Sequence, residues 1–360
     1  MNKESIYGLT LEQLKAWLIK QGHKPSRAVQ VWRWLYRKHV DDFSKMADVN
    51  KECIQLLTDS FRIGTLKEYC TKAAADGTVK FLFQLHDNNL IETVLMRNKF
   101  GLSVCTTTQV GCNIGCSFCA SGLLKKNRDL SCNEMVEQII KVQQYLDSEN
   151  CKATVSHVVV MGIGEPFDNF NNVVNFLQII KEHNGLAIAA RRITVSTSGL
   201  ADKIMEFTDA RLQVNLAISL HAPNDELRSK IMKINNVYSI DKIMQAVDYF
   251  CTKTQRRVTL EYILLKDVND KKEHACELAE LIGDRRKNVN VNLIPYNPVD
   301  EHSHYQRSEL ISMRMFYDVL KKHGIHCNKR LEHGTDIDAA CGQLRSKQIQ
   351  AMEEALDKDT

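Results

Sequence analysis

The sequence lacks any hydrophobic run long enough to cross a bilayer, and its amino terminus is polar, without the apolar segment of a secretory signal. We therefore expect a cytoplasmic protein with no membrane partner. Internal repeats and low-complexity segments are also absent. Charged residues make up 26% of the chain, which argues against a disordered or fibrous protein, and 44% hydrophobic residues suffice for a large buried core. The net charge of +4 indicates no partner by itself.

The first 40 residues differ from the rest of the chain in their charge. They contain eight Lys or Arg and two acidic residues, and aromatic residues lie between the charges: Trp17, Trp32, Trp34 and Tyr36. Such a pattern is typical of a surface that binds nucleic-acid phosphates. It also arises in a small helical domain that buries its rings and exposes its charges, and composition alone favours this second interpretation.

Local patterns divide the first hundred residues into a helical region and a β-hairpin. The helical spacing of apolar residues predicts helices within residues 1–70, with an interruption at Pro25. Residues 78–97 alternate between apolar and polar side chains on either side of Asp87–Asn89, which predicts a hairpin.

From about residue 102 onward, short apolar strands alternate with helical segments. We predict strands near 102–106, 155–161, 192–197, 213–220, 257–265, 289–295 and 325–330. We predict helices near 132–146, 170–183, 200–208, 239–252, 272–282 and 308–323. Six successive strand–helix units indicate an α/β fold with a parallel sheet. The sheet is either open and doubly wound or a partial barrel, and periodicity does not distinguish the two.

Cysteine is abundant, with twelve residues in a chain that we expect in a reducing compartment, so metal or redox chemistry is expected of some of them. Cys112, Cys116 and Cys119 lie in the predicted loop after the first strand of the alternation. Thiolates suit iron–sulfur clusters or zinc, and three of them can hold a 4Fe-4S cluster whose fourth iron stays free to bind substrate. A zinc site with a distant fourth ligand is the alternative.

Polar residues and glycines follow several predicted strands at their carboxyl ends, where barrels carry their active sites. The candidates are Gly164 and Glu165 after the second strand of the alternation, Ser196 in the third, Ser219 and His221 at the fourth, and Asn297 after the sixth. A glycine lets a ligand approach the backbone, and a carboxylate can bind an ammonium group. Each signal is weak alone, and their shared position on one rim strengthens them.

The spacing of Cys112, Cys116 and Cys119, with Phe118 before the last cysteine, resembles that of the radical S-adenosylmethionine (SAM) superfamily. This resemblance implies a partial (βα)6 TIM-like barrel. Over the whole chain, the sequence is similar to the RlmN/Cfr family of radical SAM RNA methyltransferases. The matching stretches are Ile91–Val94, Cys105, Gln109–Cys119, Met161–Pro166, Thr194–Gly199, Ser219–His221, Asn292–Pro298 and the surroundings of Cys341.

The resemblance implies four parts of the chain. Residues 1–75 would form a helical RNA-binding accessory domain, which strengthens the nucleic-acid interpretation of the first 40 residues. Residues 76–100 would form a β-hairpin extension, residues 101–345 the barrel, and residues 346–360 a carboxyl-terminal tail.

The resemblance also implies roles for individual residues. Cys112, Cys116 and Cys119 would ligate the 4Fe-4S cluster, and SAM would be contacted by Gly164, Glu165, Ser196, Ser219, Leu220, His221 and Asn297. A first SAM would methylate Cys341, and a second would be cleaved to the radical that activates this methyl group for addition to adenine. Glu92 would remove the ring proton. Cys105 would release the RNA through a transient Cys105–Cys341 disulfide.

Two reactions occur within this family. One branch methylates carbon 2 of an adenosine in the peptidyl-transferase region of 23S rRNA and of the adenosine 3′ of the anticodon in tRNA. The other methylates carbon 8 of the same rRNA adenosine and confers antibiotic resistance. Gly162–Pro166 resembles the first branch, because the second has Ala in place of Pro166; Ile163 departs from the more common Met. We also expect a flavodoxin or ferredoxin system as electron donor, and a monomer. An RNA-binding protein with a purely structural metal site is the remaining alternative.

Overall fold

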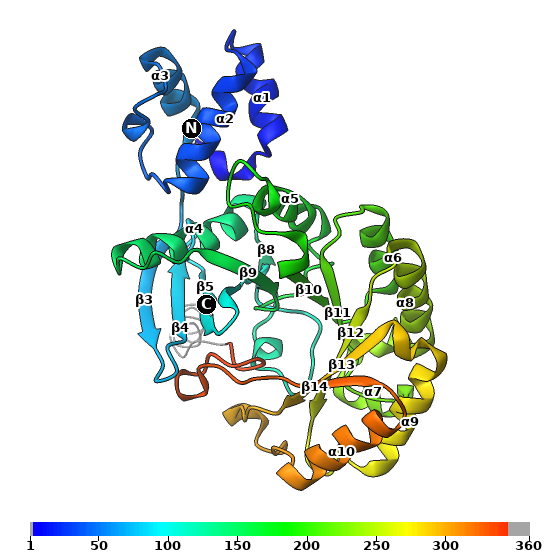
Figure 1. The fold of residues 1–360 in the computed structure, drawn as a ribbon. Coiled ribbons are helices and arrows are strands. Elements are labelled where there is room, and N and C mark those ends of the chain that lie inside the picture. Colours follow the sequence, from blue (N-terminus) through cyan, green and yellow to red (C-terminus); the bar gives the residue numbers. More distant parts are fainter. Residues whose placement is uncertain (1–2, 345–360) are drawn as a thin grey trace.

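The computed structural model describes residues 3–344. One ten-stranded sheet organises them, in the order β14-β13-β12-β11-β10-β9-β6-β5-β4-β3 (Figure 1). Its parallel part consists of β6 (Gly101–Cys105), β9 (Val155–Val160), β10 (Ile193–Thr197), β11 (Asn215–Ser219), β12 (Val258–Leu264), β13 (Val289–Pro295) and β14 (His326–Lys329). These strands neighbour one another in chain order. The sheet is therefore wound in one direction, as in a barrel, and is not doubly wound.

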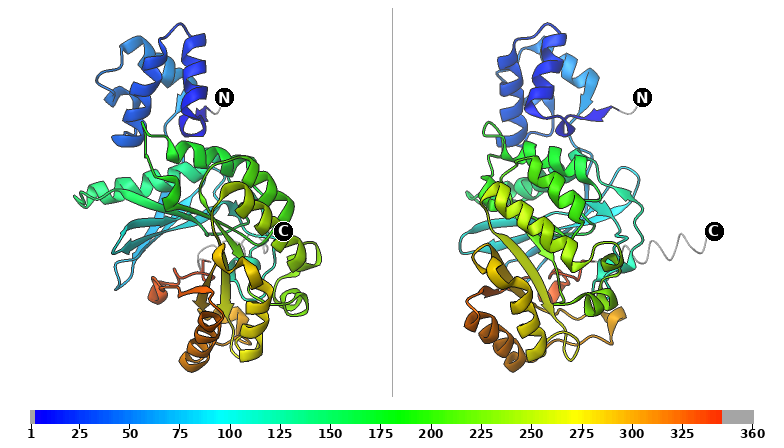
Figure 2. Two further views of the ribbon diagram at one scale, coloured as in Figure 1. Left: turned by 45° about the vertical axis from the view of Figure 1, so that its right-hand side comes forward. Right: turned by 90° about the vertical axis from the view of Figure 1, so that its right-hand side faces the viewer.

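Helices connect the parallel strands and lie along the outer face of the sheet (Figures 1 and 2). They are α4 (Cys132–Ser148), α5 (Phe170–Lys181), α6 (Ala201–Asp209), α8 (Ile240–Thr254), α9 (Lys272–Ile282) and α10 (Leu310–Lys322). The six predicted strand–helix units and the partial barrel are thus confirmed. A further helix, α7 (Asp225–Ile231), was not predicted, because seven residues are too few to show a helical period.

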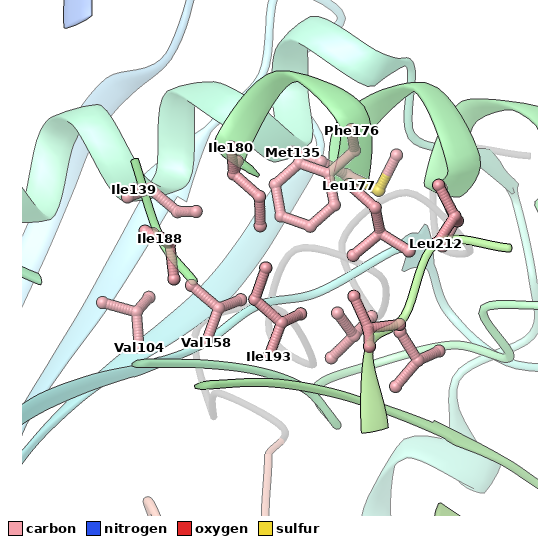
Figure 3. Close-up of a cluster of buried hydrophobic side chains, with 14 of the residues drawn as sticks. Val104, Met135, Ile139, Val158, Phe176, Leu177, Ile180, Ile188, Ile193 and Leu212 are labelled. Carbon is pink, nitrogen blue, oxygen red and sulfur yellow. The ribbon is translucent and has the colours of Figure 1, made fainter. Parts of the chain in front are cut away.

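The core between the sheet and the helices is apolar. Figure 3 shows Val104, Val158 and Ile193 of three neighbouring strands facing side chains of α4 and α5, among them Phe176 and Ile180. All five of these side chains are at most 1% exposed. Burial of side chains of this size stabilises the fold by about 1.5–3 kcal/mol each, so this contact fixes the helices against the strands.

The antiparallel end of the sheet consists of β5 (Leu90–Asn98), β4 (Val79–Gln84) and β3 (Lys67–Ala73). The pair β4–β5 is the predicted hairpin, and β5 also pairs with β6, so the hairpin continues the barrel sheet. The expectation that residues 1–70 are helical is wrong from Lys67 onward, where β3 begins. This edge strand is mostly exposed and lacks an apolar face, so its pairing with β4 determines its conformation.

The amino-terminal region forms a separate group of helices, as predicted: α1 (Leu11–Lys20), α2 (Pro25–Arg37) and α3 (Lys51–Ser60) (Figure 2). The short strands β1 (Glu4–Ser5) and β2 (Phe61–Arg62) pair beside them. Trp32 and Tyr36 are buried, which agrees with a helical domain that encloses its rings. The carboxylate of Glu137 in α4 connects this group to the barrel, because it accepts hydrogen bonds from Ser5 Oγ and from Leu66 N.

After β14 the chain returns across the strand ends toward β4, drawn in red in Figure 1. We call residues 333–344 the Cys341 segment. The expected tail, residues 346–360, lies outside the described residues. Two further short strands, β7 (Gln109–Val110) and β8 (Arg128–Asp129), pair near the predicted cluster loop. Among the described residues, no helix is both long enough and apolar enough to cross a membrane.

Candidate active site

A cavity lies at the carboxyl ends of the parallel strands, and it brings together most of the predicted site residues. Those that line it are Cys112, Cys116, Cys119, Gly164, Glu165, Ser196, Ser219, His221 and Cys341. They come from loops and strand ends far apart in the sequence, so the predicted common rim is present in the structure. Leu220 is fully buried and lies outside this set; its backbone N–H donates to the carbonyl of Glu261, which also lines the cavity.

The three-cysteine loop is held by backbone hydrogen bonds. The N–H of Cys112 donates to the carbonyl of Leu124 at 2.8 Å, and Cys116 forms a β-bridge with Met232. Gly111 has a φ of +76°, and a Cβ at this position would lie 2.0 Å from the carbonyl oxygen of Lys125. The turn before Cys112 therefore requires glycine, which explains the residue type there.

The thiols of this loop influence one another electrostatically. Burial raises the pKa of Cys112 to about 12, and the neighbouring Cys119 contributes to this increase. Burial also raises the pKa of Cys116, with further increases from Cys119 and Cys112. Three partly buried thiols that disfavour each other's ionisation are stabilised as thiolates by a shared cationic group.

Glu165 is 3% exposed and is held by backbone donors. One carboxylate oxygen accepts from Ser198 N at 2.6 Å and the other from Phe167 N at 3.0 Å. Gly164 precedes it with a φ of +105°, where a Cβ would lie 2.6 Å from Gln109 Cβ. Burial raises the pKa of Glu165, while the two backbone N–H groups favour its ionised form. Its remaining oxygen lone pairs are available to a cationic ligand in the cavity.

His221 presents a neutral imidazole to the cavity. Burial lowers its pKa to about 3, and the nearby Arg228 contributes. Its Nδ1 accepts a hydrogen bond from Ile263 N at 3.0 Å, so the proton is on Nε2. The ring packs edge to face against Phe118 of the cluster loop, with 5.0 Å between ring centroids. His221 therefore connects the end of β11 to the cluster loop.

A second cavity adjoins the first and contains both remaining cysteines of interest. Cys105 and Cys341 line it together with Asn297, whose Nδ2 donates to the carbonyl of Cys341 at 3.2 Å. Cys341 and Arg330 line both cavities. The predicted association of Cys105 with Cys341 is therefore possible within one cavity. Asn297, a predicted SAM contact, lies beside the Cys341 segment and does not line the first cavity.

Glu92 lies in β5 and is fully buried. Burial raises its pKa to about 7, and the nearby Lys80 ammonium opposes this increase. The distance from Lys80 Nζ to Glu92 Oε1 is 3.3 Å. A carboxyl group with a pKa near 7 can exchange a proton at neutral pH.

Sequence reasoning missed two arginine contacts. Arg228 of α7 is fully buried and donates to the backbone carbonyls of Ser198, Ser219 and Leu220, at the ends of two strands. Arg330 follows β14 and lies 3.3 Å from Glu261 Oε2. Neither arginine belongs to a local motif. The only sequence signal for Arg228 is Asn224, whose side chain accepts from Leu227 N at the start of α7.

Two family descriptions match the chain. "Radical SAM superfamily" matches residues 106–279, which contain the cluster loop and most of the rim. "Ribosomal RNA large subunit methyltransferase N-terminal domain" matches residues 5–63, the region of α1 to α3. The second match covers the region that we expected to act as an accessory domain.

Members of the radical SAM superfamily use a 4Fe-4S cluster and SAM, and the residues present fit both. Within residues 3–344, no three Cys, His, Asp or Glu side chains converge closely enough for a single metal ion. In a cluster each thiolate binds a different iron, so the three thiols that line this cavity suit a cluster better than a single zinc. Glu165, Ser196 and Ser219 line the remainder of this cavity and would hold SAM.

Relatives of the chain match it over nearly its whole length. A protein of Shouchella clausii, named "Probable dual-specificity RNA methyltransferase RlmN", is 68% identical over 97% of this chain and 98% of its own. A protein of the same name from Exiguobacterium sibiricum is 66% identical over the same shares. The crystal structure of a radical SAM methyltransferase from Sphaerobacter thermophilus matches with a TM-score of 0.88 and 38% identity, over 95% of this chain and 99% of that one. The chain therefore belongs to the RlmN family of radical SAM RNA methyltransferases.

Proposed function

We propose that this protein methylates carbon 2 of adenosine in RNA, with 23S rRNA and tRNA as its substrates. The names of its relatives support RNA methylation with two specificities. When bound, the cluster supplies the electron that cleaves SAM, and SAM supplies both the methyl group and the means to remove a hydrogen atom from it. The protein's own residues decide where that methyl group goes.

The observation that carries the proposal is the position of Cys341. It lines the cavity of the cluster loop and also the cavity of Cys105. A methyl group on its sulfur would therefore be made and activated in the first cavity. Cys105 lies in the second, where its sulfur can attack Cys341 once the methyl carbon is bonded to adenine. Formation of the Cys105–Cys341 disulfide then breaks the bond between that carbon and Cys341; the carbon keeps the electron pair of this bond and takes up a proton to become the methyl group of the product.

Hydrogen bonds to backbone carbonyls hold Cys341 in this position. The carbonyl of Cys341 accepts from Asn297 Nδ2, and the carbonyl of Gly342 accepts from Ala120 N at 2.8 Å, directly after the cluster loop. Ser121 Oγ donates to the carbonyl of Leu344 at 3.1 Å. The Cys341 segment is thus fastened to the cluster loop, which keeps the methyl carrier beside the cofactor site.

Glu92 acts as the base that removes the proton from the adenine carbon. Its pKa of about 7 supports this role, because at neutral pH an appreciable fraction is ionised and can accept a proton. Val94, two residues further along β5, lines the cavity of Cys105, and residues two apart in a strand share a face. Glu92 therefore faces the side of the sheet on which Cys105 and Cys341 lie.

The test uses Cys341→Ala, with Cys276→Ala as the matched control, because Cys276 lies in α9, outside both cavities. Both variants are purified without oxygen and reconstituted with iron and sulfide. We expect both to show the absorption of a 4Fe-4S cluster and both to cleave SAM under reduction. Only Cys276→Ala should form methyladenosine in RNA. Methylation by Cys341→Ala at the wild-type rate would refute the mechanism.

Nucleoside analysis decides between the two carbons. RNA from cells with and without this protein is digested to nucleosides, and the methyladenosine isomers are identified against standards by mass spectrometry. We expect 2-methyladenosine in both 23S rRNA and tRNA, because Pro166 follows Glu165. Detection of 8-methyladenosine alone would assign the protein to the carbon-8 reaction instead.

A further inference from the structure

Lys80 connects Glu92 to the segment that carries Cys341. Its ammonium lies 3.3 Å from Glu92 Oε1 and donates a hydrogen bond to the backbone carbonyl of Asp338 at 3.0 Å. The Lys80 side chain is 10% exposed and that of Glu92 is fully buried. One buried cation therefore has two acceptors, and these belong to distant parts of the chain.

The sheet fixes the first of these contacts. Lys80 is in β4 and pairs with Val94 of β5, while Leu82 pairs with Glu92. Lys80 and Glu92 are thus diagonal neighbours on the same face of an antiparallel pair, within reach of a long side chain. Thr93 points to the opposite face, where its hydroxyl donates to Gln138 Oε1 in α4. The Lys80–Glu92 pair therefore lies on the face of the sheet that points away from α4.

The Cys341 segment supplies the second contact and has further anchors on the antiparallel strands. Asp336 Oδ2 accepts from Ala75 N at 3.0 Å, and Gly334 N donates to Asp76 Oδ2 at 3.1 Å. These two bonds hold the segment at the β3–β4 turn, and Lys80 holds it three residues before Cys341. The position of Cys341, the proposed methyl carrier, therefore depends on Lys80, the side chain next to Glu92.

We propose that Lys80 is a positioning residue that couples the seating of the Cys341 segment to the charge state of Glu92. With the segment seated, the carbonyl of Asp338 holds the ammonium beside the carboxylate and favours its ionised form. The base is then ready when the methyl carrier is in place. This inference rests on the proposed role of Glu92 as the base.

The charges around Glu92 act on its pKa in both directions, and the lowering by Lys80 is larger than the opposing effect of Asp338, which belongs to the Cys341 segment. Burial raises its pKa to about 7, Lys80 lowers it, Asp338 raises it, and Lys72 of β3 lowers it slightly. Both oxygens of the carboxylate lack a hydrogen bond of good geometry within the described residues. The ammonium of Lys80 is thus the nearest group that stabilises the negative charge, and without it burial would leave the carboxyl protonated at neutral pH.

The test compares Lys80→Met, which keeps the chain length without the charge, with Lys80→Arg, which keeps the charge. Lys72→Met is the matched control for the exchange measurement, because Lys72 is exposed and pairs directly with Lys80 across β3 and β4. Asp336→Ala removes a different anchor of the Cys341 segment and serves as the positive control for its seating. Circular dichroism first establishes that all four variants are folded.

The first readout is amide hydrogen exchange of residues 333–344 without RNA, which does not depend on catalysis. We expect exchange about five- to tenfold faster in Lys80→Met and in Asp336→Ala, because each variant loses a hydrogen bond that fastens the segment to the antiparallel strands. Exchange in Lys80→Arg and Lys72→Met should match the wild type. Unchanged exchange in Lys80→Met would overturn the coupling.

The second readout is the pH dependence of single-turnover RNA methylation. In Lys80→Met we expect the acidic limb of the profile to move upward by about one pH unit or more, and we expect Lys80→Arg to restore it. A limb that does not move in Lys80→Met would also overturn the proposal. Glu92→Gln separates the two proposals: if it methylates RNA normally, the base assignment is wrong, and the exchange data still decide whether Lys80 seats the segment.

Discussion

The guanidinium of Arg330 lies 3.3 Å from the carboxylate of Glu261, and both side chains line the cavity that contains Cys341. Arg330 also lines the second cavity with Cys105. Burial raises the pKa of Cys105 to about 12, whereas the charge of Arg330 lowers it. The ion pair with Glu261 therefore holds a cation beside Cys105, which the proposed mechanism requires to act as a thiolate.

Replacement of Arg330 by Met should make Cys105 less reactive. Loss of the positive charge raises the pKa of Cys105 further, so a smaller fraction is thiolate at any given pH. We expect alkylation of Cys105 by iodoacetamide at about pH 9 to slow severalfold, as measured by peptide mass spectrometry. Arg256→Met is the control, because Arg256 donates to Asn215 Oδ1 and lines neither cysteine cavity. An equal rate in the wild type and Arg330→Met would show that Arg330 does not act on Cys105.

Replacement of Glu92 by Gln should stabilise the fold at alkaline pH. The folded pKa of about 7 exceeds the ordinary value of 4.5, so the folded state holds a proton that the unfolded state has lost between these two pH values. The free energy of unfolding of the wild type therefore falls as pH rises through this window, and Gln removes the effect. We expect Glu92→Gln to be more stable by up to about 3 kcal/mol at pH 8, with little difference near pH 4.

Urea unfolding followed by circular dichroism at both pH values measures this difference. Glu149→Gln provides the comparison, because Glu149 is exposed and pairs with Arg97 at the surface. Its effect should stay below about 1 kcal/mol at either pH. A Glu92→Gln variant that is less stable than the wild type at pH 8 would mean that the buried carboxylate is better stabilised than its surroundings indicate.

Replacement of Glu137 by Gln should loosen the amino-terminal helices from the barrel. The Glu137 carboxylate is 1% exposed and accepts from the backbone N–H groups of Thr65 and Leu66. Both N–H groups donate to one oxygen, Oε2, so in Gln a neutral amide oxygen would accept them more weakly and the amide nitrogen would replace the oxygen that accepts from Ser5 Oγ. We expect the free energy of unfolding to fall by about 2 kcal/mol and proteolytic cleavage between residues 60 and 67 to accelerate. Glu12→Gln, at an exposed surface pair with Lys15, should change neither.

Replacement of Arg228 by Met should weaken the binding of SAM. Arg228 holds the carbonyls of Ser198, Ser219 and Leu220, and without it the ends of β10 and β11 lose their common donor. We expect SAM affinity to fall at least tenfold, as measured by calorimetry on the reconstituted protein, together with a loss of stability of a few kcal/mol. Lys230→Met is the control on the same helix, because its ammonium pairs with Glu226 at the surface. Unchanged SAM affinity in a folded Arg228→Met protein would exclude this role.

The spacing of apolar residues along the chain was enough to predict most strands and helices of the barrel. Each parallel strand is a short apolar run followed by a helical period, and these signals lie within one element, so periodicity detects them. The strand β3 gave no such signal, because its side chains are mostly exposed and its conformation depends on pairing with β4. The choice between a barrel and a doubly wound sheet likewise depends on the order of the strands in the sheet. The spacing of apolar residues along the chain gives no information on that order.

The sequence by itself determined the cluster loop, because Cys112, Cys116 and Cys119 lie close together in one short loop, and its glycines allow the backbone to turn tightly. It also determined the rim, since the carboxyl ends of parallel strands meet at one edge. Only the tertiary structure decided which charges surround the reacting groups. Lys80 reaches Glu92 and Asp338, and Arg330 reaches Glu261, through contacts between distant parts of the chain. Such contacts depend on packing in three dimensions, and no local pattern of residues records them.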